Sequence, residues 1–158
     1  RGGIDIPADP PPVLVAALGP QMLKLVGKTA DGTATWMTGP KTIQDHVVPV
    51  INDAAEKENR SQPQVVAAIP VCIHPDKEVA TEYAKRDFGF YGDLPSYRAM
   101  LDREGLENSW DIAITGSFEQ VAEGMQEYVD AGATQVVAAV YGPEESREET
   151  VSQLAELL

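Results

Sequence analysis

The residues best suited to bind a ligand directly follow the first apolar run of the chain, residues 13–18. Gly19 and Pro20 stand there, and proline favours a helix start at this place because its fixed φ suits the first turn. A helix start offers unpaired N–H groups and the positive end of the helix dipole, and glycine lets another group approach the backbone closely. The segment can therefore seat a phosphate group. The simpler interpretation is that Gly19 and Pro20 only turn a strand into a helix.

A second group of candidates, Trp36, Met37 and Thr38, ends the next apolar run. An indole there can line a ligand pocket beside the Thr38 hydroxyl, but Trp36 can equally be ordinary core filler. Cys72 and His74 end the third run; a histidine can titrate near neutral pH, and a thiol whose pKa is lowered can act as a nucleophile. No partner residue at a suitable spacing supports either role. We interpret the pair as a buried structural thiol and a loop histidine.

The composition excludes several kinds of partner and site. Lys and Arg total 12 against 25 Asp and Glu, a net charge of −13 that argues against nucleic acids and anionic membranes as partners. The single cysteine, Cys72, rules out an internal disulfide and a Cys-rich zinc site and fits a cytoplasmic location. No apolar run reaches the roughly 18 residues of a membrane span. The sequence also lacks a P-loop, a G-x-G-x-x-G motif, a metal-ligand cluster and a Ser–His–Asp arrangement.

The hydrophobic pattern predicts strands and helices in alternation. Four apolar runs are expected to be strands, at residues 13–18, 33–37, 64–73 and 135–140. Helices are expected from Pro20 onward, at 42–58, 76–88, 96–103 and 144–158, and between a capping box at 117–120 and the stop at Gly132. Strict alternation implies parallel strands with right-handed crossovers. Residues 1–12, rich in Gly, Asp and Pro, are expected to be an extended lead-in.

Three of the predicted strands share the tripeptide Val-Ala-Ala, at residues 15–17, 66–68 and 137–139. The repeat indicates either that small residues let helices approach a parallel sheet, or that a barrel unit is repeated with small residues near its ligand end. Alternation alone does not distinguish a barrel from an open doubly wound sheet.

Three further expectations concern a histidine, a proline and a group of aromatic residues. His46 lies beside apolar positions of helix 42–58 and is expected on the helix surface. Pro70 removes one hydrogen-bond donor from the third strand, so we expect a bulge or an unpaired position there. The aromatic residues Phe90, Tyr91 and Tyr97 form either a lid over a substrate or a packed loop.

The order of several short motifs resembles that of a known family. Residues 15–25 read Val-Ala-Ala-Leu-Gly-Pro-Gln-Met-Leu-Lys-Leu, and Ala30-Asp31-Gly32 and Trp36 follow. Residues 115–121 read Thr-Gly-Ser-Phe-Glu-Gln-Val, and residues 130–134 read Asp-Ala-Gly-Ala-Thr. From about residue 11 onward the chain resembles the luciferase-like flavin- and deazaflavin-dependent oxidoreductases and monooxygenases, in particular the actinobacterial members that use the deazaflavin coenzyme F-420.

The resemblance implies an α/β fold that is the C-terminal half of a (β/α)₈ TIM barrel. Residues 13–158 would form four strand–helix units, barrel strands five to eight, in an incomplete domain. The missing half would be supplied by association, or the chain would form a homodimer.

The resemblance also implies hydride transfer between F-420 and a small organic substrate. The cofactor phosphate would lie at Ala17, Leu18, Gly19, Pro20 and Gln21, and the cofactor pocket at Trp36, Met37 and Thr38. Catalytic residues are not identified and are expected in the absent half. Two alternatives stay open: an FMN-dependent monooxygenase on the same barrel, and a non-catalytic α/β binding module.

Overall fold

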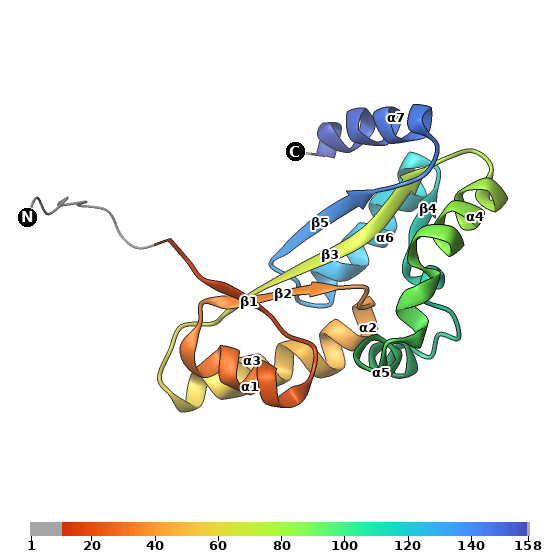
Figure 1. Cartoon of the computed structure of the whole chain (residues 1–158). Helices are drawn as coiled ribbons and strands as arrows, with labels where there is room; N and C mark the ends of the chain where they lie inside the picture. Colours follow the sequence, from red (N-terminus) through yellow and green to blue (C-terminus); the bar gives the residue numbers. More distant parts are fainter. Residues whose placement is uncertain (1–10, 158) are drawn as a thin grey trace, which may run out of the picture.

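The computed structural model describes residues 11–157, which form an α/β fold with five parallel strands (Figure 1). The strands are β1 (Leu14–Ala16), β2 (Gly32–Trp36), β3 (Gln64–Ile73), β4 (Ile114–Gly116) and β5 (Gln135–Val140). The α-helices are α1 (Pro20–Thr29), α2 (Pro40–Thr42), α3 (Val48–Lys57), α4 (Lys77–Phe88), α5 (Pro95–Glu104), α6 (Phe118–Asp130) and α7 (Glu144–Leu154). A π-helix, Ile43–Val47, joins α2 to α3, and 3₁₀ segments are Gly89–Asp93, Ser109–Ile112 and Ala155–Leu157.

Residues 1–10 of the expected lead-in lie outside the described residues, and Pro11 and Pro12 belong to no helix or strand. Within residues 11–157, no helix combines the length and the apolar character that crossing a membrane requires.

Strand β3 is the centre of the sheet. Its residues 64–68 pair with β2, and β2 pairs in turn with β1. Residues 66–71 of β3 pair with β5 on the opposite edge. The four strands predicted from the sequence are therefore confirmed as parallel neighbours in sequential order, β1-β2-β3-β5.

The fifth strand, β4, was not predicted from the sequence. It pairs with Val71–Ile73 at the carboxyl end of β3. Because β5 occupies the other edge of β3 at Val71, β4 lies on the same edge as β2, which pairs with the earlier residues of β3. A strand of three residues is too short to show a period-two pattern.

Of the two alternatives expected at Pro70, the bulge is wrong, and the position is unpaired on one edge of β3. The register between β3 and β5 runs unbroken through Pro70, opposite Ala139. On the other edge, Pro70 falls between Ala68, the last partner of β2, and Val71, the first partner of β4. The missing N–H therefore lies in a gap of the ladder and disrupts no pairing.

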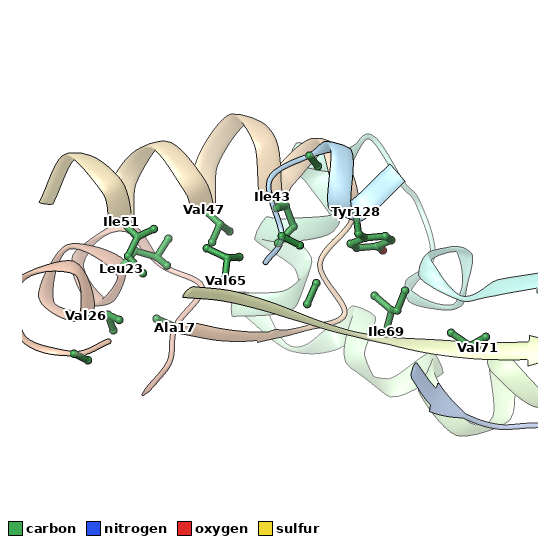
Figure 2. Close-up of a cluster of buried hydrophobic side chains, with 14 of the residues drawn as sticks. Ala17, Leu23, Val26, Ile43, Val47, Ile51, Val65, Ile69, Val71 and Tyr128 are labelled. Atoms are coloured by element: carbon green, nitrogen blue, oxygen red, sulfur yellow. The ribbon is translucent and has the colours of Figure 1, made fainter. Parts of the chain in front are cut away.

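The hydrophobic core lies between one face of the sheet and the helices. Alternate side chains of β3, Val65, Ala67, Ile69 and Val71, belong to one buried cluster, as the period of two in a strand requires (Figure 2). The helices contribute Leu23 and Val26 from α1, Ile51 from α3, and Val121 and Tyr128 from α6. Each large side chain buried in this way contributes roughly 1.5–3 kcal/mol. Helices α1, α3 and α6 thus cover the same face of the sheet.

The opposite face is apolar and partly open. Leu14 and Val137 alternate with the core-facing Val15 and Val136, and they remain 37% and 47% exposed. Their neighbours on this face are small residues such as Ala34 and Ala68. A sheet face of this composition is normally covered by another layer.

Asp31 ties the amino-terminal ends of three strands together. Its backbone N–H donates to Val13 (2.9 Å), its carboxylate accepts from the Val13 N–H (2.8 Å), and its carbonyl accepts from the Gln64 N–H (2.9 Å). Arg60 donates to the Ala30 carbonyl (2.9 Å) and reaches the Asp31 carboxylate at 3.4 Å. Because the rise per residue is nearly the same in all strands, fixing the amino-terminal ends also fixes where the carboxyl ends of β1 and β2 lie.

His46 lies in the π-helix between α2 and α3 and is only 5% exposed. The expected surface position is therefore wrong. Buried positions in this stretch, Thr42, Ile43, His46, Val47 and Ile51, recur every four residues, a wider spacing than the 3.6 residues of an α-helix. Pro49 explains the widening, since proline has no N–H and its ring clashes with the carbonyl four residues earlier.

The close contact of α1 with α3 gives a test of the packing. A Cβ added at Gly27 would lie 2.4 Å from the Ile51 carbonyl oxygen and 2.8 Å from the Ala54 Cβ. We expect Gly27→Ala to lower the free energy of unfolding by about 1–3 kcal/mol through overpacking. Chemical denaturation measures the change. The control is Gly89→Ala, where the nearest atoms lie at 3.7 Å; equal stability of the two variants would contradict the packing of α1 on α3.

Candidate functional site

The first Gly-Pro corner, residues 18–22, joins β1 to α1. Gly19 is the N-cap residue and its carbonyl accepts the first helical hydrogen bond from the Leu23 N–H (3.0 Å). A Cβ at Gly19 would meet no atom within 4 Å, so the chain itself leaves space there. Pro20 has no N–H, and the free donors of the first turn are the amides of Gln21 and Met22. Met22 was not among the residues singled out from the sequence, because its amide and not its side chain matters here.

The second Gly-Pro corner, residues 38–42, joins β2 to α2 in the same way, and an anion occupies it. The Glu104 carboxylate, at the end of α5, accepts from the Lys41 N–H (3.1 Å), the Thr42 N–H (2.8 Å) and the Thr42 hydroxyl (2.6 Å). A Cβ at Gly39 would clash with the Glu104 carboxyl group, so a larger residue at this position would displace the carboxylate from the corner. The corner therefore binds a carboxylate through the amides of the second and third residues after glycine.

The first corner has the same order of residues but no protein carboxylate. Gln21 and Met22 stand where Lys41 and Thr42 stand in the second corner. Among the described residues, no side chain caps α1 and no acidic residue lies in its first turn. The other helices that follow strands have carboxylates: Asp76 at α4, Glu119 at α6, and Glu144 and Glu145 at α7. The first corner thus has the donors and the space that a phosphate group needs.

Two contacts fix the first corner to the rest of the structure, one through core packing and one through a hydrogen bond. Ala17 is 5% exposed and belongs to the main core cluster. The Leu18 carbonyl oxygen lies 2.9 Å from His46 Nε2, which must donate the hydrogen because a carbonyl can only accept. This contact could not be predicted from the sequence, because 28 residues separate the two partners.

Trp36 is the last residue of β2, and Met37 and Thr38 follow it beside the first corner. Ala16 pairs with Ala34, so Trp36 and Leu18 each lie two residues beyond a paired position. Met37 and Thr38 are 1% and 0% exposed, and the Thr38 hydroxyl donates to the Trp36 carbonyl (3.1 Å). The Trp36 indole is half-buried, and its N–H has no hydrogen-bond partner among the described residues.

Aromatic side chains gather around Trp36. Phe88 and Tyr91 contact its indole edge to face, with ring centroids 5.9 Å and 6.1 Å away. Tyr91 also contacts Tyr97 at 4.8 Å and Phe90 at 4.1 Å. Phe90 is 56% exposed. The segment after β3 is therefore a packed aromatic wall with one ring turned to solvent, beside the end of β2.

Cys72 and His74 do not form a reactive pair. Cys72 is fully buried, and burial raises the pKa of its thiol, which keeps it protonated. His74 accepts a hydrogen bond at Nδ1 from the Asp76 N–H (2.9 Å) within its own loop. Within residues 11–157, no group of three His, Cys, Asp or Glu side chains is placed to hold a metal ion.

Comparisons with known proteins find relatives in one enzyme family. A family model described as luciferase-like monooxygenase matches residues 1–135. An F420-dependent glucose-6-phosphate dehydrogenase from Intrasporangium calvum is 23% identical over 158 residues, covering 90% of this chain and 47% of that protein. A 5,10-methylenetetrahydromethanopterin reductase from Methanopyrus kandleri is 28% identical over 165 residues, covering 86% and 47%. The chain spans about half the length of the curated relatives it matches.

A solved structure shares the fold. An F420-dependent secondary alcohol dehydrogenase, in complex with an F420–acetone adduct, superposes with a TM-score of 0.78 at 17% identity. The match covers 96% of this chain and 49% of that chain. The strands and helices described above therefore correspond to half of a luciferase-like TIM barrel.

The second corner gives a test of carboxylate binding by this motif. We expect Glu104→Ala to lower the free energy of unfolding by about 1–2 kcal/mol, because two helix-start amides lose their acceptor. Added formate should restore part of the loss by entering the vacated place. Thermal unfolding with and without formate measures both effects, and Glu107→Ala, at an exposed neighbour, is the control. A loss of stability that formate leaves unchanged would mean that the corner does not act as an anion seat.

Proposed function

Because this chain belongs to the luciferase-like monooxygenase family, we propose that it supplies the C-terminal half barrel of an oxidoreductase that uses the deazaflavin coenzyme F-420. β1, β2, β3 and β5 would be barrel strands five to eight, and residues 13–158 one incomplete domain. The observation that carries the proposal is the first Gly-Pro corner, which has free amides and no protein anion. Relatives named for F420 dependence support the choice of cofactor.

In this proposal the bound deazaflavin supplies a carbon that gives or accepts hydride. The chain's own part is to hold and orient. The amides of Gln21 and Met22 would bind the phosphate, with Gly19 leaving room for it and Ala17, Leu18 and Pro20 setting the backbone path. Trp36 and the aromatic wall would shield the ring side from water. Met37 and Thr38 are buried, so their contribution would come through the backbone.

The substrate is proposed only as a small organic molecule. The net charge of the chain is −13, and no feature of the sequence identifies the substrate further. The family's monooxygenase chemistry keeps FMN as the second candidate cofactor. Both cofactors carry a phosphate, so the corner serves either, and direct binding must distinguish them.

The open sheet face defines the partner in this proposal. We propose that the first half of the barrel covers Leu14, Ala34 and Val137, as the matched barrels are twice the length of this chain. A homodimer of the chain is the other arrangement that would cover the face. A cytoplasmic location, which the single cysteine favours, is part of the same proposal.

The phosphate assignment predicts a charge effect at Gly19. In the protein that contains both barrel halves, Gly19→Glu should weaken F-420 binding by roughly 10- to 100-fold, because the new carboxylate meets the phosphate. Gly19→Ala is the matched control: it adds a methyl group where no atom lies within 4 Å, without charge. Titration of the deazaflavin absorbance measures both affinities.

Equal affinity of Gly19→Glu and the unmodified protein would show that the phosphate lies elsewhere. Unmodified protein that binds FMN and not F-420 would favour the monooxygenase alternative. Binding of neither cofactor would leave the non-catalytic module as the better account.

The open face predicts association. We expect the chain alone, residues 1–158, to dimerise or aggregate, because within residues 11–157 the edge strands β1 and β5 are paired on one side only and the apolar face is partly open. Light scattering at increasing concentration measures the mass in solution. A monodisperse monomer at high concentration would argue that the face needs no cover.

A further inference from the structure

We propose that His46 is a positioning residue for the phosphate group: its hydrogen bond to the Leu18 carbonyl aims the Gly19 amide out of the first corner, toward the ligand. The inference rests on the proposed function and assigns to it a residue that makes no contact with the ligand. The observation behind it is the 2.9 Å distance between His46 Nε2 and the Leu18 carbonyl oxygen.

The contact is built into the fold. His46 is 5% exposed, and its neighbours Ile43 and Val47 are fully buried in the main core cluster. These core contacts limit how far the ring can move. The π-helix that Pro49 imposes keeps Thr42, His46 and the partly buried Val50 in one row, four residues apart. His46 is thus held facing the corner.

The planarity of the peptide bond transmits the effect. In a trans peptide the carbonyl and the following N–H point in opposite directions, so fixing the Leu18 oxygen also fixes the Gly19 N–H. That N–H has no acceptor among the described residues. With the Leu18 oxygen held toward His46, the Gly19 N–H points away from it and joins the amides of Gln21 and Met22 as a third donor.

The hydrogen bond also removes a competitor. A free carbonyl at Leu18 could turn toward the corner, where its oxygen would repel an anion. The donor on His46 stabilises the orientation in which only N–H groups are presented. Pre-organised donors of this kind increase affinity because binding requires no reorientation of the backbone.

Three proteins test the proposal, each with both barrel halves present. His46→Phe keeps an aromatic ring but has no donor. His46→Gln is the matched control, because its amide nitrogen is as many bonds from Cα as Nε2 and can donate to Leu18. Each variant and the unmodified protein are titrated with coenzyme F-420 and with the deazaflavin riboside that lacks the phosphate.

We expect His46→Phe to weaken F-420 binding by about tenfold, with riboside affinity unchanged, and His46→Gln to recover most of the loss. A merely structural role would weaken both ligands together. If the unmodified protein prefers F-420 over the riboside and His46→Phe preserves that preference, this inference fails and the proposed function stands. If the unmodified protein binds both equally, the phosphate seat itself fails.

A measurement on the unmodified protein keeps the test independent of how well the variants fold. Nitrogen-15 NMR of the histidine rings reports which ring nitrogen carries hydrogen. We expect a hydrogen on His46 Nε2, with a chemical shift that changes on adding F-420 and stays the same on adding the riboside. A His46 ring with hydrogen on Nδ1 only overturns the proposal.

Discussion

The pairing of β3 with three other strands is the constraint on which the rest of the structure depends. β3 is ten residues long, and β2, β4 and β5 all take their register from it. β1 is added through β2, and Asp31 holds the amino-terminal ends of these strands level. This register fixes where β1 and β2 end. It therefore also places both Gly-Pro corners side by side at the carboxyl ends of these strands.

Each corner then creates the same physical problem, and the chain solves it in two ways. A helix that begins at proline leaves the next two amides without intrahelical acceptors. In the second corner Glu104 supplies the acceptor, at a distance of 62 residues from Thr42 along the chain. In the first corner none of the described side chains does so. Helix-start amides that face water or a polar ligand need no protein partner, so the first corner is stable without one.

Sequence reasoning predicted what depends on local pattern. The apolar runs, the Ser117–Gln120 capping box and the helix start at Pro20 follow from periodicity and from residue conformation, and the structure contains them. The helix start at Pro40 was not predicted, because the helix was expected only from residue 42. Sequence reasoning missed β4, whose three residues are a strand only because β3 extends past β2. It also placed His46 on the surface, because a histidine beside apolar helix positions is more often exposed and because its partner, the Leu18 carbonyl, lies 28 residues away in the sequence. The Val-Ala-Ala repeat was ambiguous for a related reason: Val15 faces the helices, whereas Val66 pairs level with Ala34 and lies on the other face. A shift of one residue in register reverses the face, and register depends on the partner strands.

The acidity of the chain explains why backbone groups are the suitable anion donors here. With 25 acidic residues against 12 basic ones, a flexible lysine or arginine side chain has many carboxylates of the same protein to pair with. Backbone amides cannot be drawn away in this manner, because their positions are fixed by the helix and by the strand register. They carry only partial charge, however, so several must converge and none may be opposed by a nearby carbonyl oxygen. In the proposed phosphate site, that requirement makes the orientation of the Leu18–Gly19 peptide decisive, and the hydrogen bond to Leu18 would give His46, 28 residues away, a direct physical influence on how well the phosphate is held.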